Sequence, residues 1–407
     1  MAQGSVGVNI LSEIVQIGGS NVSAFGDIIT VNPDPQVQLD FVFGINDQTG
    51  FSTVANSATV DVDANRLRLQ TGVDPAGGAH FRSLRIAKYR PGEGMLARFT
   101  GAWTSSAADS HQYIGAGSEQ DGYFFGYRNT DFGVCLRKGG VDTFVLQADW
   151  NVDKCNGTGP SGFTWNHALG NVMMITYPYL GYGNIFFWVQ NPVNGVWILC
   201  HVKRYANSSA LVQIDNPSLR FYCEAVNTGN TTNLISYVGS AGIFVTGKVE
   251  YLGAQFGQIG SKNGVSTEAN VISLRNATSY NGKANTGVMR IRSISFCSDG
   301  TNNPSLMFVK KDVTLGGSPS FTAISGTTAD QGVTITSGQS IASFDTAGTT
   351  ITGGTQLFNT CCARNGDVFI DMAPYDVLIE PGETFTFSAS APGSTDMRIA
   401  VNWNEDV

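Results

Sequence analysis

Apolar and polar residues alternate one by one near the end of the chain. In 397–403 the side chains of Met397, Ile399, Val401 and Trp403 are apolar and their neighbours are mostly polar, and Phe385 and Phe387 are spaced in the same way. Successive side chains of a strand point to opposite faces of a sheet, so this period of two predicts strands with one buried face. Weaker alternation at 333–336 and 350–352 predicts two further strands.

Short runs of apolar and aromatic residues recur through the middle of the chain, separated by turn-forming residues. They occupy 95–100, 122–127, 143–147, 171–177, 185–189, 196–202 and 289–296. Such runs at near-regular spacing are typical of a β-sandwich or β-barrel, and none of them predicts an amphipathic helix.

Turn-forming clusters divide the chain into three parts. Pro33 and Pro35 disfavour helix and predict an N-terminal arm with extended segments over 1–73. A cluster of turn residues at 297–304 places a boundary near residue 300. We therefore predict a central β-sandwich over 74–300 and a C-terminal β-sandwich over 301–407.

Composition favours the same fold class. Only 14% of the 407 residues are charged and 49 are glycine, whereas the wet faces of helices need long charged side chains. With 42% hydrophobic residues the chain can also build a sizeable core. The expected fold is all-β, with two sandwich or jelly-roll-like domains behind the arm.

Charge argues against a nucleic-acid partner. The net charge is −8, and duplex binding needs clustered basic residues. The one basic cluster, 82–90, alternates with Leu84 and Ile86 and is interpreted as a strand with a solvated face. The start of the chain resembles no secretory signal, and no apolar run approaches the length that crosses a bilayer, so we expect neither secretion nor membrane insertion.

No motif for a cofactor or metal is complete. A calcium loop beginning at Asp61 would need glycine where Arg66 stands and glutamate where Gly72 stands. The four histidines are scattered singly, and the seven cysteines have no C-x-x-C pair, which favours free thiols. We expect no cofactor, no metal and no catalytic residue.

Paired carboxylates offer the main enzymatic alternative, because sandwich glycosidases place two acids on facing strands. The candidates are Asp109, Glu119, Asp121, Glu224 and Glu250. Glu119 and Asp121 belong to a turn by composition, without the apolar walls that would raise a carboxyl pKa.

Exposed aromatic rings offer the alternative of weak sugar binding. Tyr177, Tyr179 and Tyr182 lie among one proline and two glycines, a setting that can leave amphipathic rings at the surface. The competing interpretation is that these rings are packed over one end of the sandwich.

Several glycine-aromatic segments together resemble virion structural proteins of tailed phages and large DNA viruses. They are 25–29, 35–46, 88–94, 121–127 with 132–134, 380–386 and 401–405. The resemblance implies a β-rich tail fibre, spike or capsid-surface component, located on the virion after assembly in the host cytoplasm.

We therefore predict a virion structural protein that forms a homo-oligomer, a homotrimer in the first instance, with other virion proteins and host-surface glycans as partners. Residues 155–202 contain no charged side chain, so its subunit contacts would be apolar or neutral. The alternatives are a capsid cement or decoration protein without host contact, and a carbohydrate-binding or glycoside-hydrolase β-sandwich protein.

Overall fold

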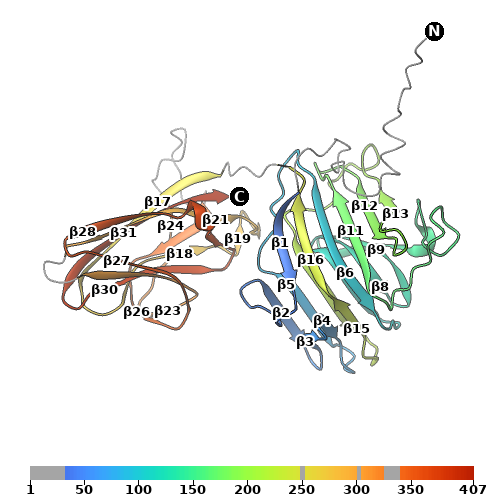
Figure 1. Cartoon of the computed structure of the whole chain (residues 1–407), viewed down its shortest axis with the longest axis horizontal. Helices are drawn as coiled ribbons and strands as arrows, with labels where there is room; N and C mark the ends of the chain where they lie inside the picture. The colour runs from blue at the N-terminus through green and yellow to red at the C-terminus, as the bar shows by residue number, and fades with distance from the viewer. Residues whose placement is uncertain (1–32, 248–252, 300–303, 325–339) are drawn as a thin grey trace, which may run out of the picture. The chain divides into compact units, whose positions relative to one another are not determined.

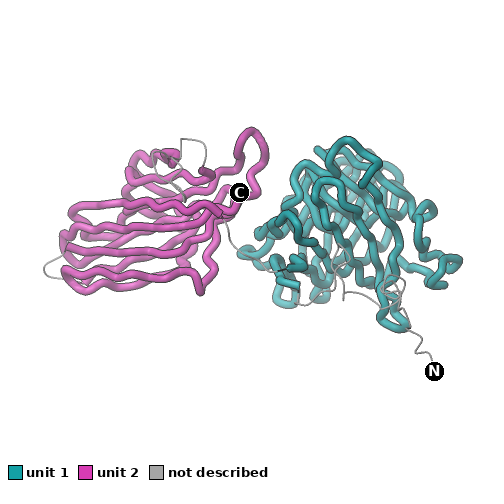
Figure 2. Tube along the Cα trace, turned by 90° about the horizontal axis from the view of Figure 1, so that it is seen from above, with its two compact units in different colours: residues 1–249 teal, residues 250–407 magenta. Residues whose placement is uncertain are grey.

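The structure is a computed structural model that describes residues 33–247, 253–299, 304–324 and 340–407. It divides into two compact units, Met1–Val249 and Glu250–Val407 (Figures 1 and 2). The described elements are strands and two single-turn 3-10 helices, Gln147–Asp149 and Ala373–Tyr375, so the all-β expectation is confirmed.

Two antiparallel sheets form the first unit. The seven-stranded sheet runs in the order β10 (Val141–Leu146), β9 (Asp131–Lys138), β8 (Gly122–Arg128), β7 (Ser110–Gly117), β14 (Arg220–Asn227), β5 (Gly78–Ser83) and β2 (Gly50–Ala55). The nine-stranded sheet runs β13 (Trp197–Lys203), β12 (Ile185–Gln190), β11 (Asn171–Tyr177), β6 (Met95–Trp103), β15 (Ile235–Val238), β4 (Arg66–Gln70) and β3 (Thr59–Asp63), with β16 (Ser240–Val245) joining β6 to β1 (Asp34–Asp40).

Side chains from both sheets meet in one core. Phe99 on β6 lies with its ring centroid 6.4 Å from that of Phe125 on β8 and 6.2 Å from that of Phe221 on β14. Alternate residues of these strands are buried in the same cluster. The first unit is therefore a β-sandwich, held by the burial of one face of each sheet.

A second pair of sheets forms the second unit. One sheet contains β17 (Ala254–Val265), β31 (Thr395–Asp406), β21 (Val288–Ser298), β28 (Gly366–Asp371) and β29 (Leu378–Ile379); the other contains β24 (Thr322–Ala323), β25 (Ala342–Asp345), β18 (Ala269–Asn276), β30 (Thr384–Ser390), β22 (Ser305–Lys311) and β27 (Thr355–Cys362). Two further sheets have two strands each: β19 (Ser279–Tyr280) pairs with β20 (Lys283–Ala284), and β23 (Thr314–Gly317) pairs with β26 (Gly348–Thr352).

The alternation near the C-terminus is confirmed. Phe385 and Phe387 on β30 are buried, as are Met397, Ile399, Val401 and Trp403 on β31, and all of them belong to one core. The seven apolar runs of the middle region are also strands, and the strand predicted at 350–352 is part of β26. The strand expected at 333–336 lies outside the described residues.

The predicted three-part division is wrong in two places. Strands β1 to β4, within the supposed arm of 1–73, are integral to the sheets of the first unit, and β1 is an edge strand that pairs with β16. The boundary falls at 249/250 instead of near 300, because β17, β18 and β21 pair with strands of the C-terminal half. The turn residues at 297–304 connect two strands of one unit.

Candidate functional site

A group of charged and aromatic side chains lies on the face of the seven-stranded sheet that points away from the core. On β14, Phe221 and Cys223 enter the core, so the alternating side chains of Tyr222 and Glu224 lie on the opposite face. Glu224 is paired with His80 of β5 on one side and with Tyr113 of β7 on the other. This register brings together residues far apart in the sequence.

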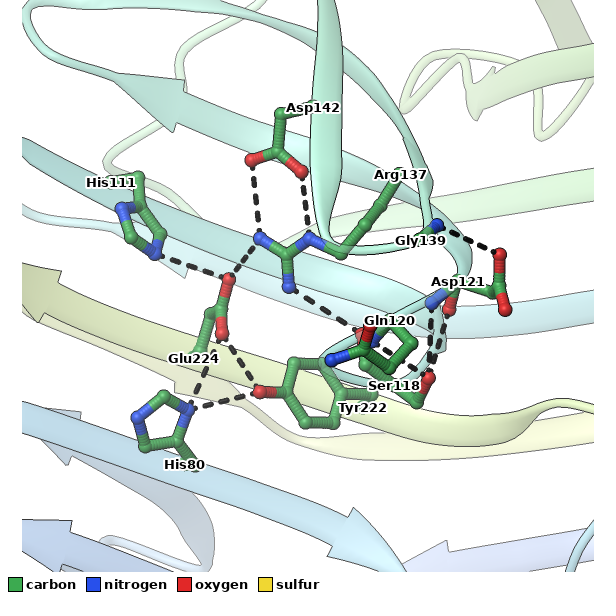
Figure 3. Close-up of polar contacts among 10 residues, drawn as sticks. All are labelled: His80, His111, Ser118, Gln120, Asp121, Arg137, Gly139, Asp142, Tyr222 and Glu224. Atoms are coloured by element: carbon green, nitrogen blue, oxygen red, sulfur yellow. Dashed lines mark hydrogen bonds and ion pairs between the residues drawn. The ribbon is translucent and has the colours of Figure 1, made fainter. Parts of the chain in front are cut away.

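Six side chains make up what we call the Glu224 cluster: His80, His111, Arg137, Asp142, Tyr222 and Glu224 (Figure 3). Oε1 of Glu224 lies 2.7 Å from a terminal nitrogen of Arg137 and 3.2 Å from Nε2 of His111. Oε2 accepts the hydroxyl hydrogen of Tyr222 at 2.8 Å and lies 3.3 Å from Nδ1 of His80. The two oxygens of Glu224 therefore face four donors.

Arg137 connects Glu224 to a second carboxylate. Its Nε and a terminal nitrogen donate to the two oxygens of Asp142 at 2.7 and 3.1 Å, the bidentate geometry that suits a guanidinium. The guanidinium carbon also lies 5.6 Å from the ring centroid of Tyr113 and 5.4 Å from that of Phe124. Ion pairs and cation–π contacts therefore fix this side chain from several sides.

Electrostatics keep the central carboxylate ionised. Burial alone would raise the pKa of Glu224, but the hydrogen bonds from His111 and His80 and the charge of Arg137 outweigh it and hold that pKa well below its ordinary value. Burial would likewise lower the pKa of Arg137, and its contacts with Asp142 and Glu224 raise it instead. Glu224 and Arg137 are thus both charged at neutral pH.

Aromatic rings lie close to these charges on the same face of the sheet. Tyr113, Phe124 and Tyr222 are buried in a small cluster of their own, separate from the main core. A Cβ atom on Gly117 or Gly122 would collide with the ring of Phe124, so glycine at these positions allows the ring to lie on the backbone. The floor of the site is therefore formed largely by closely packed aromatic rings.

The two histidines are the most accessible members of the cluster. Their side chains are 27% (His80) and 24% (His111) exposed, whereas that of Glu224 is only 3% exposed. A carboxylate can only accept, so the nitrogen of each ring that faces Glu224 carries the hydrogen. In the neutral ring, Nε2 of His80 and Nδ1 of His111 are then acceptors, and neither has a hydrogen-bond partner among the described residues.

The tyrosines selected from the sequence are not grouped at the surface. Tyr177 is fully buried against Tyr123, with ring centroids 4.9 Å apart, and Tyr179 is buried with its hydroxyl donating to the carbonyl of Ile214 at 2.7 Å. Only Tyr182 is exposed, at 41%. The expectation of three exposed rings was wrong, because β11 carries Tyr177 into the core and Tyr179, in the loop after it, is also buried there.

The carboxylates selected from the sequence are scattered. Asp109 and Glu119 are exposed, and Glu250 lies outside the described residues. Asp121 is buried, and desolvation raises its pKa although it accepts the backbone N–H groups of Asp215 at 3.0 Å and Gly139 at 3.3 Å. The expectation that no apolar wall would raise a pKa in this turn was therefore wrong for Asp121.

Sequence reasoning included Glu224 among the candidates but missed its partners. His80 and His111 are far apart in the sequence and lie on different strands, and they come together only through β14. One signal was available in the sequence: Glu224 stands between Cys223 and Ala225 within the largely apolar run 221–226, where a lone carboxylate needs a partner.

The described residues contain no candidate metal centre, since no three or more of their His, Cys, Asp or Glu side chains are grouped as metal ligands. In the part of the chain that the structure describes, no helix is both long enough and apolar enough to cross a membrane.

Comparison with known proteins gives structural likenesses alone. No family model and no curated protein matches the chain. The metal-free carbohydrate recognition domain of Emp46p is similar over 54% of this chain and 100% of its own, with 10% identity and a TM-score of 0.35. Arcelin-5, a lectin-like defense protein from Phaseolus vulgaris, covers 51% of this chain and 97% of its own, with 10% identity and a TM-score of 0.33.

A third similar structure is lectin UEA-II complexed with galactose, which covers 52% of this chain and 99% of its own at 8% identity and a TM-score of 0.33. Likenesses of this size do not assign a function. Any function must therefore be argued from the residues of this chain.

Proposed function

We propose that the first unit binds a carbohydrate on the outer face of its seven-stranded sheet, at the Glu224 cluster. The observation that carries the proposal is the pair of partly exposed imidazoles, each oriented by one buried carboxylate. In the neutral form of its ring, each of His80 and His111 offers one acceptor nitrogen, from strands on either side of β14. Sugar hydroxyls are donors as well as acceptors, so fixed acceptors on a rigid sheet suit them.

The energetic cost of the cluster supports a role beyond folding. Removing charged groups from water is expensive, and buried ion pairs are often no more stabilising than apolar residues of the same size. Here Glu224 and Arg137 are both almost fully buried on a sheet face outside the core. Such groups are concentrated at functional sites, where they fix the orientation of neighbouring side chains.

Asp142 and Phe144 would extend the site along β10. The carboxylate of Asp142 is held by Arg137, but the side chain remains 18% exposed. The oxygen lone pairs that Arg137 does not use can therefore accept hydrogen bonds from a ligand. Phe144 follows Asp142 by two residues and so lies on the same face of β10. It is half-buried over Gly133, where it can contact the apolar side of a sugar ring.

The proposal is for binding without hydrolysis. Glycoside hydrolysis needs one carboxyl held protonated beside an ionised partner. In the Glu224 cluster both carboxylates contact Arg137, and the pKa of Glu224 is lowered. In the described part of the first unit, the acid with a raised pKa is Asp121, which is tied to backbone N–H groups in a turn.

Replacing His80 and His111 together by alanine tests the proposal. The double variant should lose glycan binding, because both ligand-facing acceptors disappear while Glu224 keeps Arg137 and Tyr222. Replacing the exposed Tyr182 by alanine is the matched control and should leave binding unchanged. Binding that survives in the double variant, or release of reducing sugar by the wild-type chain, would refute the proposal.

The virion role inferred from the resemblance stays a prediction alongside this proposal. A sugar-binding unit is compatible with a component that contacts host-surface glycans. Assembly as a homotrimer and contact with other virion proteins also stay predictions.

A further inference from the structure

The outer face of the nine-stranded sheet carries a second polar feature, on the sheet opposite that of the Glu224 cluster. Arg98 lies on β6 between Ala97 and Phe99, which both enter the core, so its side chain is on the opposite face. Its neighbours in the register are Met174 on β11 and Gly242 on β16. The side chain therefore stands in the middle of the sheet, with strands on both sides.

Arg98 has no counter-charge among the described residues. Within that part of the chain it makes no ion pair, and its Nε is buried without a hydrogen-bond partner. Burial lowers the pKa of Arg98, which is the expected sign for a cation that is removed from water and not compensated. Arg137 of the Glu224 cluster and Arg68 of β4, by contrast, are paired with carboxylates.

A hollow of about 410 Å³ lies beside this guanidinium. Its lining includes the polar side chains of Gln38, Thr100 and Ser240 and the apolar side chains of Val172 and Phe244. Gly242, opposite Arg98, makes room for the ring of Phe244, because a Cβ atom at this position would lie 2.9 Å from that ring. The ring centroid of Trp197 lies 6.0 Å from the guanidinium carbon, which places an aromatic face near the cation.

One acidic residue, Asp40, also borders the hollow. Its Oδ1 accepts the backbone N–H of Val42 at 3.2 Å, and it makes no ion pair with Arg98. Asp40 is exposed, so solvent and salt screen its charge far more than that of the half-buried Arg98. Of the two charges that border the hollow, the cation is therefore the less screened.

We propose that Arg98 is the anchor of a site for an acidic saccharide, with the guanidinium binding a carboxylate or sulfate and the aromatic and aliphatic side chains contacting the sugar ring. A guanidinium matches the two oxygens of such an anion, and a bound anion would compensate the charge that the protein leaves unpaired. This site is distinct from the Glu224 cluster and does not depend on it.

Saturation-transfer NMR on the full chain at low salt provides the test, with glucuronate, glucose 6-sulfate and glucose as probes. Glucuronate and glucose 6-sulfate should receive saturation at their ring C–H protons, and glucose should not. Arg98→Gln should weaken the binding of both anions about tenfold or more, since charge-assisted hydrogen bonds are lost. Arg98→Lys should weaken the binding of the anions less than Arg98→Gln does, because lysine keeps the positive charge although it lacks the bidentate guanidinium.

Two control variants show whether the anions bind at Arg98 itself. Arg398→Gln makes the same charge change at an exposed arginine of the second unit and should leave binding unchanged. The His80→Ala, His111→Ala double variant should also bind both anions normally, which distinguishes this site from the Glu224 cluster. Equal binding of glucose and glucuronate, or Arg98→Gln binding within twofold of wild type, would overturn the proposal.

A stability measurement gives an independent readout. Removing an uncompensated half-buried charge should not destabilise the fold, so Arg98→Met should melt at or above the wild-type temperature while losing the anions. Addition of glucuronate should then raise the melting temperature of the wild-type chain and not that of Arg98→Met. A large fall in the melting temperature of Arg98→Met would show that Arg98 serves folding instead.

Discussion

Glu224 is the residue on which the arrangement of the outer sheet face depends. Four donors surround its two oxygens, and its side chain is almost entirely removed from water. The negative charge of Glu224 therefore stabilises the donors around it, and these donors stabilise the buried carboxylate in turn. The histidines are oriented, and Arg137 is compensated, by this one carboxylate.

Replacing Glu224 by glutamine should destabilise the first unit by about 3–5 kcal/mol, because it leaves the buried Arg137 with Asp142 as its remaining counter-charge. Calorimetric or denaturant unfolding measures the change. Glu119→Gln is the matched control at an exposed position and should stay within about 0.5 kcal/mol of wild type. Equal stability of the two variants would contradict the structural role of Glu224.

The buried His167 makes the folding stability of the first unit depend on pH. Its ring stacks on Phe132 with centroids 3.8 Å apart, and burial lowers its pKa from 6.5 to about 4. The unfolded chain therefore binds a proton between pH 6.5 and 4 that the folded chain does not, so stability falls as the pH falls through this window.

Between pH 7 and pH 5, His167 should lower the free energy of unfolding by up to about 2 kcal/mol. Comparing unfolding of the wild type and His167→Gln at these two pH values checks it. The glutamine variant should show the smaller difference between them. An unchanged difference would mean that His167 does not stay neutral in the folded protein.

At the level of strands, much of the structure could be predicted from the sequence. Alternation located β30 and β31, and apolar runs located β8, β11 and β12, because burial of one or both faces leaves a direct pattern in the residues. Strand pairing left no such pattern. The turn residues at 297–304 join β21 to β22, which belong to the two sheets of one sandwich.

The candidate site was harder to predict for the same reason. His80, His111 and Glu224 lie on three strands that are adjacent in the sheet but distant in the sequence. Tyr177 showed the opposite problem: its local sequence suggested a surface loop, and β11 carries it into the core. Spacing along the chain reports local conformation, whereas a site on a sheet depends on register.

The corrected boundary predicts which C-terminal fragment folds. In 250–407, β31 is flanked by β17 and β21, whereas 305–407 lacks both of these partners. Trp403 is the only tryptophan in either fragment, so its emission reports directly on the burial of β31. It should be blue-shifted in 250–407 and water-like in 305–407, and a folded 305–407 would contradict the assignment of β17 and β21.

Within 250–407, Trp403→Ala should cost about 3–5 kcal/mol, the usual range for removing a large buried ring. Trp403 stacks on Phe256 with centroids 6.0 Å apart, and its Nε1 donates to Glu405 at 3.0 Å. Circular dichroism melts of the 250–407 fragment with and without the Trp403→Ala substitution measure the loss of unfolding free energy. A cost below about 1 kcal/mol would mean that the core does not close around this ring.

Over the whole molecule, the chain contains two units with separate cores. Calorimetry should therefore resolve two unfolding transitions that respond to different substitutions. Glu224→Gln should lower one of them and Trp403→Ala the other. A single transition shifted by both would show that the units unfold together.

The predicted homo-oligomer is tested by sedimentation in about 0.1 and 1 M salt. Since 155–202 contains no charged side chain, contacts made through it should survive the shorter Debye length. Dissociation to monomers at high salt would argue for charged contacts instead. A monomer in both buffers would remove the basis for the homotrimer.

The central claim is that the outer face of the seven-stranded sheet binds a sugar through His80 and His111. A glycan array probed with the wild-type chain and with the His80→Ala, His111→Ala variant tests it most directly. The account predicts that the wild type retains one or more glycans and that the variant, still folded by circular dichroism, loses them by tenfold or more. A wild type that retains no glycan, or a variant that retains the same glycans equally well, would contradict it.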